Sequence, residues 1–170
     1  PSGITFNAIT GGFFVADRLN HCIRQMASTG DVTTIAGVPG AAGYVDAPAP
    51  GARFNYPADV AFDKNYAYLY IADPGNHCIR RLDAQFNVIT FAGSIATGNV
   101  NGAGTGSRFV NPTSLICDSS LRILVIDSSN HNIRSIERLG AMVSTLSGVG
   151  IAGLTNGIAS GAQFRKPSEI

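Results

Sequence analysis

A threefold internal repeat dominates this sequence and limits the folds open to it. The pattern Asp-x-x-Asn-His-x-Ile-Arg occurs at residues 17–24, 73–80 and 127–134, a period near 55 residues. Because a unit of this size cannot bury its faces alone, successive units must stack on one another. Two further patterns return in the same order: Val-x-Thr-x-x-Gly at 32–37, 88–93 and 143–148, and Gly-x-x-Phe-x-x-Pro at 51–57, 106–112 and 161–167.

Each unit is predicted to form four short strands, which we call a, b, c and d. In the second unit they span residues 59–62, 68–72, 77–82 and 88–92. β-branched and aromatic residues fill these segments, while Asp, Asn, Gly and Pro separate them. Short polar turns between successive strands indicate an antiparallel meander, and a four-stranded meander repeated radially is a propeller blade.

The expected fold class is therefore all-β, with three four-stranded antiparallel blades, strand a innermost and almost no helix. The blades should cover approximately residues 1–55, 56–110 and 111–166, with the start of a further strand at 167–170. Strands packed between blades are apolar on both faces, which agrees with 45% hydrophobic and 14% charged residues. No apolar run approaches the roughly 18 residues of a membrane-spanning helix. The net charge of +1 shows no overall excess for nucleic acid.

The three patterns together resemble NHL repeats, with Ile23, Ile79 and Ile133 in the place of the signature leucine. The resemblance covers the whole chain and implies a β-propeller, commonly of five or six blades, so that this chain would be half of a six-bladed ring. It also implies a range of functions, because NHL propellers serve as protein-binding, RNA-binding and occasionally enzymatic domains. The third repeat departs from the others at Ser128, Ser129 and Asn132.

The polar residues that recur in every unit are interpreted as structural. The three histidines could form a metal site or act as general bases, but identical placement in each blade favours turn formation and hydrogen bonding to nearby backbone. The arginines could form a basic stripe, but their constant offset from an aspartate favours ion pairs within or between blades. These positions are Asp17, Asn20, His21, Arg24, Asp73, Asn76, His77, Arg80, Asp127, Asn130, His131 and Arg134.

Nothing in the sequence points to a catalytic centre, a cofactor or a metal site. No Ser-His-Asp, Cys-His or paired-carboxylate arrangement stands apart from the repeat. The glycine-rich segment 98–106 lacks the Gly-Lys-Ser/Thr of a phosphate loop and is interpreted as a connection between blades. Cys22, Cys78 and Cys117 are an odd number and are predicted to be thiols without a disulfide. Together with the lack of a usable glycosylation site, this favours a reducing compartment such as the cytoplasm.

The predicted function is a scaffold that binds a protein or peptide through one face of the propeller. In a meander, the b–c turns and the d–a connections lie at the same end, and loops held by rigid strands commonly carry binding. RNA binding by that face, or a lyase or hydrolase activity, are the alternatives; RNA would require a basic patch and stacking aromatic residues. The candidate binding residues are Arg18, Leu19, Tyr44, Tyr56, Pro74, Gly75, Ser128 and Ser129.

Three blades do not close a ring, and the exposed end faces should be more apolar than a monomer tolerates. Either the parent protein supplies about three further blades, or two copies join head to tail. The first alternative is favoured because the chain begins at Pro1 without a Met and stops within a motif. In either case the 170-residue chain should self-associate or aggregate.

Overall fold

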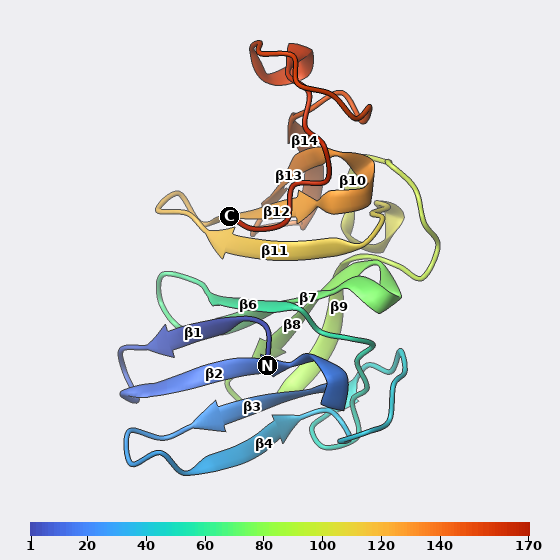
Figure 1. Ribbon diagram of the computed structural model, residues 1–170. Helices are drawn as coiled ribbons and strands as arrows, with labels where there is room; N and C mark the ends of the chain where they lie inside the picture. Colours follow the sequence, from blue (N-terminus) through green and yellow to red (C-terminus); the bar gives the residue numbers. More distant parts are fainter.

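The computed structural model describes all of residues 1–170 and consists of three antiparallel sheets stacked face to face (Figure 1). We call them blades 1, 2 and 3. Within each blade, four strands follow one another in sequence order. Blade 1 contains β1 (Ile4–Asn7), β2 (Gly12–Asp17), β3 (Cys22–Met26) and β4 (Val32–Ala36); blade 2 contains β6 (Asp59–Phe62), β7 (Tyr68–Asp73), β8 (Cys78–Asp83) and β9 (Asn87–Gly93); blade 3 contains β11 (Pro112–Cys117), β12 (Arg122–Asp127), β13 (Asn132–Glu137) and β14 (Met142–Ser147).

These strands confirm the all-β prediction, and the four strands expected in the second unit agree with β6–β9 to within one residue at each end. The helical structure is limited to five 3₁₀ turns of three residues each: η1 (Arg18–Asn20), η2 (Pro74–Asn76), η3 (Gly104–Gly106), η4 (Ser128–Asn130) and η5 (Ala159–Gly161). No helix is long and apolar enough to cross a bilayer.

The prediction of four strands per blade was incomplete, because blades 2 and 3 each have a fifth. The connection that leaves β4 forms β5 (Ala47–Pro48), which pairs with the outer strand β9 of the next blade. The connection that leaves β9 forms β10 (Gly102–Ala103), which pairs with β14 in the same way. These two-residue strands carry no alternating pattern of their own, so periodicity could not reveal them. Each connection therefore belongs in part to the blade that follows it.

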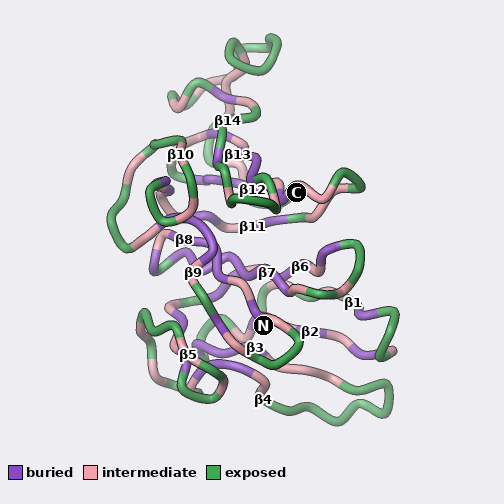
Figure 2. The backbone as a smooth tube through the Cα atoms, turned by 180° about the vertical axis from the view of Figure 1, so that it is seen from behind, coloured by how far each residue is buried: buried purple, intermediate pink, exposed green.

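The hydrophobic core lies between the blades, in two layers that use equivalent residues. Between blades 1 and 2, the side chains of Phe14, Ala16 and Ile23 meet Val60, Ile71, Leu82 and Val88. Between blades 2 and 3, Tyr70, Ala72 and Ile79 meet Leu115, Val125, Ile136 and Val143. Figure 2 shows the resulting bands of buried backbone through the middle of the stack. Since full burial of one such side chain contributes about 1.5–3 kcal/mol, stacking is the main stabilising term.

Strand a lies innermost in each blade, as predicted. β6 contacts both β1 and β11, so the three a strands line one side of a common axis. Residues 167–170 continue this series without being assigned as a strand. They lie beside β11, where the Thr113 hydroxyl donates to the Ser168 carbonyl and the Ile170 amide donates to Ser114 Oγ. The expected start of a further strand therefore has the position of strand a but no b strand with which to pair.

Candidate binding face and its supporting framework

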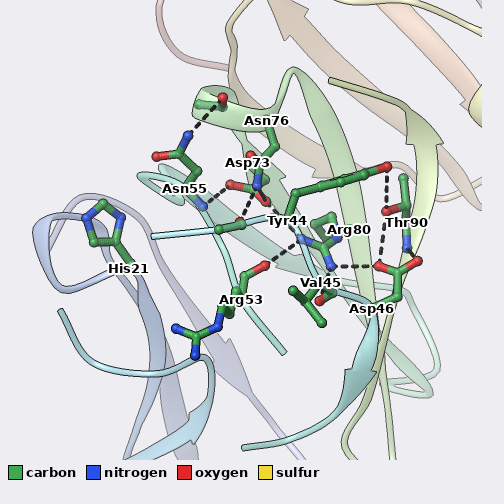
Figure 3. Close-up of polar contacts among 12 residues, drawn as sticks. His21, Tyr44, Val45, Asp46, Arg53, Asn55, Asp73, Asn76, Arg80 and Thr90 are labelled. Carbon is green, nitrogen blue, oxygen red and sulfur yellow. Dashed lines mark hydrogen bonds and ion pairs between the residues drawn. The ribbon is translucent and has the colours of Figure 1, made fainter. Parts of the chain in front are cut away.

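A buried ion pair inside blade 2 holds the connection that arrives from blade 1 (Figure 3). The Arg80 guanidinium lies 3.1 Å from Asp73 Oδ2, and both side chains are fully buried. Arg80 Nη1 also donates to the Arg53 carbonyl at 2.9 Å, while Nη2 donates to the Val45 carbonyl and to Asp46 Oδ1 at 2.9 and 2.7 Å. One guanidinium thus fixes two separate stretches of the connection. The planar fork of arginine suits this, because it donates in several fixed directions at once.

Asp73 accepts hydrogen bonds from more than the arginine. The Asn55 amide donates to its Oδ1 at 2.7 Å, and Asn76 Nδ2 donates to its Oδ2 at 2.8 Å. The same Asn76 Nδ2 also donates to the Gly43 carbonyl, which is a third point on the connection. Burial nevertheless outweighs these donors and raises the pKa of Asp73 to about 6. We call the Asp, Asn and Arg of one blade, with the connection they hold, a node.

Blade 3 repeats the node contact for contact. Arg134 lies 3.0 Å from Asp127 and donates to the carbonyls of Arg108 and Val100. Asn101 takes the place of Asp46, its Oδ1 accepting from Arg134 Nη2 at 2.7 Å. Burial lowers the pKa of Arg134 and raises that of Asp127. The predicted ion pairs are therefore confirmed within blades 2 and 3, and the arginines also reach the connection between blades.

Blade 1 has the same node residues in a looser arrangement. Arg24 lies 3.6 Å from Asp17, and 29% of its side chain is exposed. Arg24 makes none of the bonds to a connection that Arg80 and Arg134 make through their Nη groups. The buried Nε has no partner in any of the three arginines, so it does not distinguish blade 1.

The repeated histidines bridge neighbouring blades. His21 Nδ1 accepts from the Tyr56 amide at 3.1 Å, and His77 Nδ1 accepts from the Asn111 amide at 3.2 Å. His131 Nδ1 accepts from the Lys166 amide in the same way. Each histidine therefore holds the residue just before the proline that opens the next strand a, as the structural interpretation of these residues requires.

The histidines also shape the b–c turns. Each ends a 3₁₀ turn with φ near 55°, in the left-handed region, and its amide closes the turn by donating to the first carbonyl. A non-glycine residue is uncommon there, and Asn, Asp and His are several-fold enriched. The Asn-His signature is thus the local solution to a tight turn whose last side chain must point to the next blade.

An axial channel opens at the end of the molecule that carries the b–c turns and d–a connections. It is an open hollow of about 510 Å³ and is lined by the first residues of each strand a. The residue two places after each opening proline faces it, and this residue differs in every unit: Gly3, Asp59, Ser114 and Glu169. Arg18 from the first b–c turn also lines it. The framework around the channel is constant, whereas its lining varies.

Neighbouring strands are linked through the lining residues themselves. Asp59 Oδ2 accepts from the Ser114 hydroxyl at 2.7 Å and from the Leu115 amide at 3.0 Å. Ser114 Oγ in turn accepts from the Ile170 amide. At the first position only glycine fits, because a Cβ on Gly3 would clash with the side chain and backbone of Asp59. Glu169 is exposed and makes no such link, so the channel offers at least one carboxylate and several hydroxyl groups to solvent.

The structure brings the predicted b–c turns and d–a connections together. The Gly75 amide donates to the Asn55 carbonyl, the Ser129 amide donates to the Val110 carbonyl, and Tyr56 packs edge-on against His21. Arg18, Leu19, Gly75 and Ser129 are exposed, as are Tyr44 and Tyr56. Pro74 and Ser128 are buried, so these two candidate residues do not present a surface.

Tyr44 has a structural role as well, because its ring lies against the Arg80 guanidinium at 5.3 Å and its hydroxyl contacts Thr90 Oγ1. Sequence reasoning missed the channel residues Gly3, Asp59, Ser114 and Glu169. The sequence carried only a weak signal for them: the position two places after the proline changes most in chemical type, from glycine to a carboxylate to a hydroxyl, but the positions beside it vary as well.

The described side chains form no cluster of three or more His, Cys, Asp or Glu residues that could hold a metal ion. The three cysteines are free thiols, with Cys22 and Cys78 buried and Cys117 partly buried. Burial raises the pKa of the Cys117 thiol to about 12, which keeps it protonated and unreactive near neutrality.

The stacked four-stranded sheets, with strand a along a common axis, define the chain as blades of a β-propeller. No protein-family model matches it. It is 25% identical over its whole length to the chloroplastic protein SUPPRESSOR OF QUENCHING 1 of Arabidopsis thaliana, and 31% identical over 53% of its length to NHL repeat-containing protein 2 of Bos taurus. The chain spans 17% and 12% of these two relatives.

Solved structures agree on the fold. A Bacteroides thetaiotaomicron protein of unknown function superposes with a TM-score of 0.79 at 17% identity, over 98% of this chain and 40% of its own. An auxiliary nutrient binding protein from the same organism superposes with a TM-score of 0.75 at 18% identity, over 98% and 41%. A streptogramin B lyase superposes with a TM-score of 0.60 at 14% identity, over 85% and 39%. Relatives and structures together support a β-propeller of the NHL-like type.

Proposed function

We propose that this chain is part of a scaffold that binds a protein or peptide through the face formed by its b–c turns and d–a connections, centred on the axial channel. The observation that carries the proposal is the contrast between a constant framework and a variable lining. The nodes and histidines repeat, but the channel residues change from Gly3 to Asp59 to Ser114 to Glu169. Side chains that vary on a rigid support are suited to recognition.

The chemistry of this face suits a polypeptide. Leu19 is 75% exposed and Tyr56 is 43% exposed, so both offer apolar surface around the channel mouth. The channel hydroxyl groups and the Glu169 carboxylate can accept hydrogen bonds from the amides or basic side chains of a peptide. Tyrosine is enriched in protein interfaces, since one end of the ring is apolar and the other can form hydrogen bonds.

RNA binding fits this face less well. Arg18, Arg165 and Lys166 are exposed at this end, but Asp59 and Glu169 lie at its centre and would repel phosphate. Of the aromatic side chains that could stack on bases, Tyr44 already packs on Arg80 and Tyr56 on His21. We therefore propose a peptide in preference to RNA.

We also propose that the chain is not an enzyme, although a streptogramin B lyase and a gluconolactonase from Xanthomonas campestris are among the structures with a similar fold. In this chain each histidine accepts a backbone hydrogen bond at a different blade. No two of them share a site at which they could act together on a substrate.

The experiment is selection of a displayed random-peptide library on the immobilised chain. We expect enriched peptides whose binding weakens about tenfold or more in Leu19→Ala. The matched control is Leu139→Ala, because Leu139 is 81% exposed but lies in the c–d turn of blade 3, at the opposite end of the molecule. A second pair is Glu169→Gln, at the channel, and Glu137→Gln, away from it.

Two results would contradict the proposal. One is enrichment of peptides that bind the Leu19 and Leu139 variants equally. The other is the absence of any enriched peptide while a pool of single-stranded RNA binds the chain with a steep dependence on salt, which would favour the RNA alternative.

A further inference from the structure

The outer faces of blades 1 and 3 carry the two halves of the interface found twice inside the molecule. The face of blade 2 that packs on blade 1 carries Val60, Ile71, Leu82 and Val88. The equivalent positions on the outer face of blade 1 carry Ile4, Val15, Met26 and Val32. They surround an open hollow together with Asp17 and Arg24. On blade 3, the positions of Tyr70, Ala72 and Ile79 are occupied by Leu124, Ile126 and Ile133. Leu124 and Ile133 are partly exposed, whereas Ile126 is already buried within the single chain.

The polar groups of the blade 1 node lack partners that the other two nodes have. Arg80 Nη2 and Arg134 Nη2 each bind one Asx side chain, Asp46 or Asn101, at 2.7 Å. Each also binds the carbonyl of the preceding valine. Arg24 has neither, and Asp17 lacks the amide that Asp73 receives from Asn55 and that Asp127 receives from Val110. The unmet groups of this node would be satisfied by a connection that offers three features. These are an Asp or Asn side chain and the carbonyl of the preceding residue, both for Arg24, and a backbone amide further along for Asp17.

Residues 148–166 form such a connection. Asn156 stands where Asp46 and Asn101 stand in the earlier units, and Arg165 stands where Asn55 and Val110 stand. The segment already has the internal bonds of a held connection: Gly153 donates to the Phe164 carbonyl and Gln163 donates to the Thr155 carbonyl. Its apolar side chains are open to solvent, with Leu154 at 91% and Ile158 at 87% exposure.

We propose that the open face of blade 1 is an interface for a connection of this kind, and that in the 170-residue chain a second copy supplies it. Arg24 of each copy binds Asn156 of the other, Asp17 receives the Arg165 amide, and the apolar face of blade 1 packs on that of blade 3. Two copies joined head to tail in this way bury both open faces of each chain. The node of blade 1 is incomplete without the second copy.

Continuity with the existing interfaces favours a second copy as occupant, because the same positions carry the same kinds of side chain a third time. Residues 167–170 of one copy occupy the place that residues 1–4 of the other need, since Pro167 and Pro1 open equivalent strands. They must move aside, so Glu169 lines the channel in the single chain and leaves it in the dimer. Few contacts oppose this, because this segment is held to β11 by the Ser168 carbonyl and the Ile170 amide.

Sedimentation velocity of the 170-residue chain tests the proposal. We expect a species of twice the 17.7 kDa chain mass. Arg24→Ala and Asn156→Ala should each weaken the dimer at least tenfold, whereas Asn156→Asp, which places the carboxylate of Asp46 opposite Arg24, should retain it. The matched control is Arg122→Ala, because Arg122 is partly exposed and pairs within its own blade with Asp118. Circular dichroism establishes that each variant keeps its sheets.

A mixing experiment separates this interface from non-specific association. The Arg24→Ala chain keeps an intact 148–166 segment, and the Asn156→Ala chain keeps an intact blade 1 node, so an equimolar mixture contains one complete interface per pair. The mixture should dimerise more tightly than either variant alone. A monomeric wild-type chain, a dimer unaffected by Arg24→Ala and Asn156→Ala, or a mixture no tighter than its components would each overturn the proposal.

Discussion

At the scale of single residues, the buried Arg80–Asp73 pair shows why a polar group can be a fixed part of a propeller core. Taking two charges out of water costs several kcal/mol, and the attraction between them offsets this only when their remaining donors and acceptors are satisfied. The connection supplies partners for both Nη groups of Arg80 through two carbonyls and Asp46, and leaves only the buried Nε without one. The pair therefore depends on the connection as much as the connection depends on the pair.

Replacing Arg80 tests this dependence. Arg80→Leu leaves the Asp73 carboxylate buried without its counter-ion, and we expect the free energy of unfolding to fall by about 3–5 kcal/mol. Urea unfolding measures this. Arg122→Leu is the control, because Arg122 forms a partly exposed pair with Asp118 and should cost no more than about 1 kcal/mol. Equal effects of the two substitutions would contradict the role given to the node.

The pH dependence of stability tests the protonation of Asp73. Its folded pKa is raised to about 6 from an ordinary value of 3.8. The stability that protonation contributes is fully present below the unfolded pKa and is lost as the pH rises through about 6. At about 1.4 kcal/mol per pKa unit, the wild type should lose up to about 3 kcal/mol relative to Asp73→Asn between pH 3.8 and 6.5. If the unfolding free energies of the wild type and Asp73→Asn change equally with pH over this range, Asp73 is not the group that titrates.

At the scale of elements, the ends of the d strands are fixed by backbone geometry. Gly37 and Gly148 follow β4 and β14, and Gly93 is the last residue of β9; all three have φ between 83° and 99°, in the left-handed region. A Cβ on any of them would lie 2.7–2.8 Å from the carbonyl oxygen of the histidine in its own blade, and a Cβ on Gly93 would also lie 2.7 Å from the Phe109 ring. The glycine of the Val-x-Thr-x-x-Gly motif is therefore required where the chain leaves the blade.

Gly93→Ala should destabilise the protein by more than about 1 kcal/mol, because strain and a backbone clash act together at this site. Gly140→Ala is the control, since Gly140 also has a positive φ but no atom lies within 4 Å of its added Cβ. Gly93→Ala introduces both a clash and backbone strain, whereas Gly140→Ala introduces strain alone. Thermal unfolding of the two variants therefore measures the effect of the clash. A Gly93 variant as stable as the Gly140 variant would mean that the end of strand d can relax.

The elements also show what the sequence could and could not predict. The β-branched and aromatic content of short segments such as 68–72, bounded by turn residues, predicted strands a to d, because each strand carries its own local signal. The two-residue strands β5 and β10 were missed, since they depend on pairing with β9 and β14 rather than on their own side chains. The burial of Pro74 and Ser128 was missed for a related reason: the 3₁₀ turn that contains each of them is covered by a neighbouring connection.

At the scale of the whole molecule, the predicted face and the channel meet at one end because strand a begins there. The period predicted the stacked blades, and parity of the strands predicted which loops share a face. The channel lining was not predicted, since the convergence of Asp59, Ser114 and Glu169 follows from how three separate strands meet at an axis. Repeat patterns describe each unit, whereas a site between units also depends on the angle at which they stack.

The central claim is that nodes and histidines hold the connections rigidly between blades. Hydrogen exchange of individual backbone amides, followed by NMR, tests it most directly. The amides of Asn55 and Val110 donate to the node aspartates, and those of Tyr56 and Asn111 donate to histidines, although all four lie outside strands. We expect their protection to approach that of amides in β8. Exchange of these four amides at rates close to those of an unstructured peptide would contradict the account.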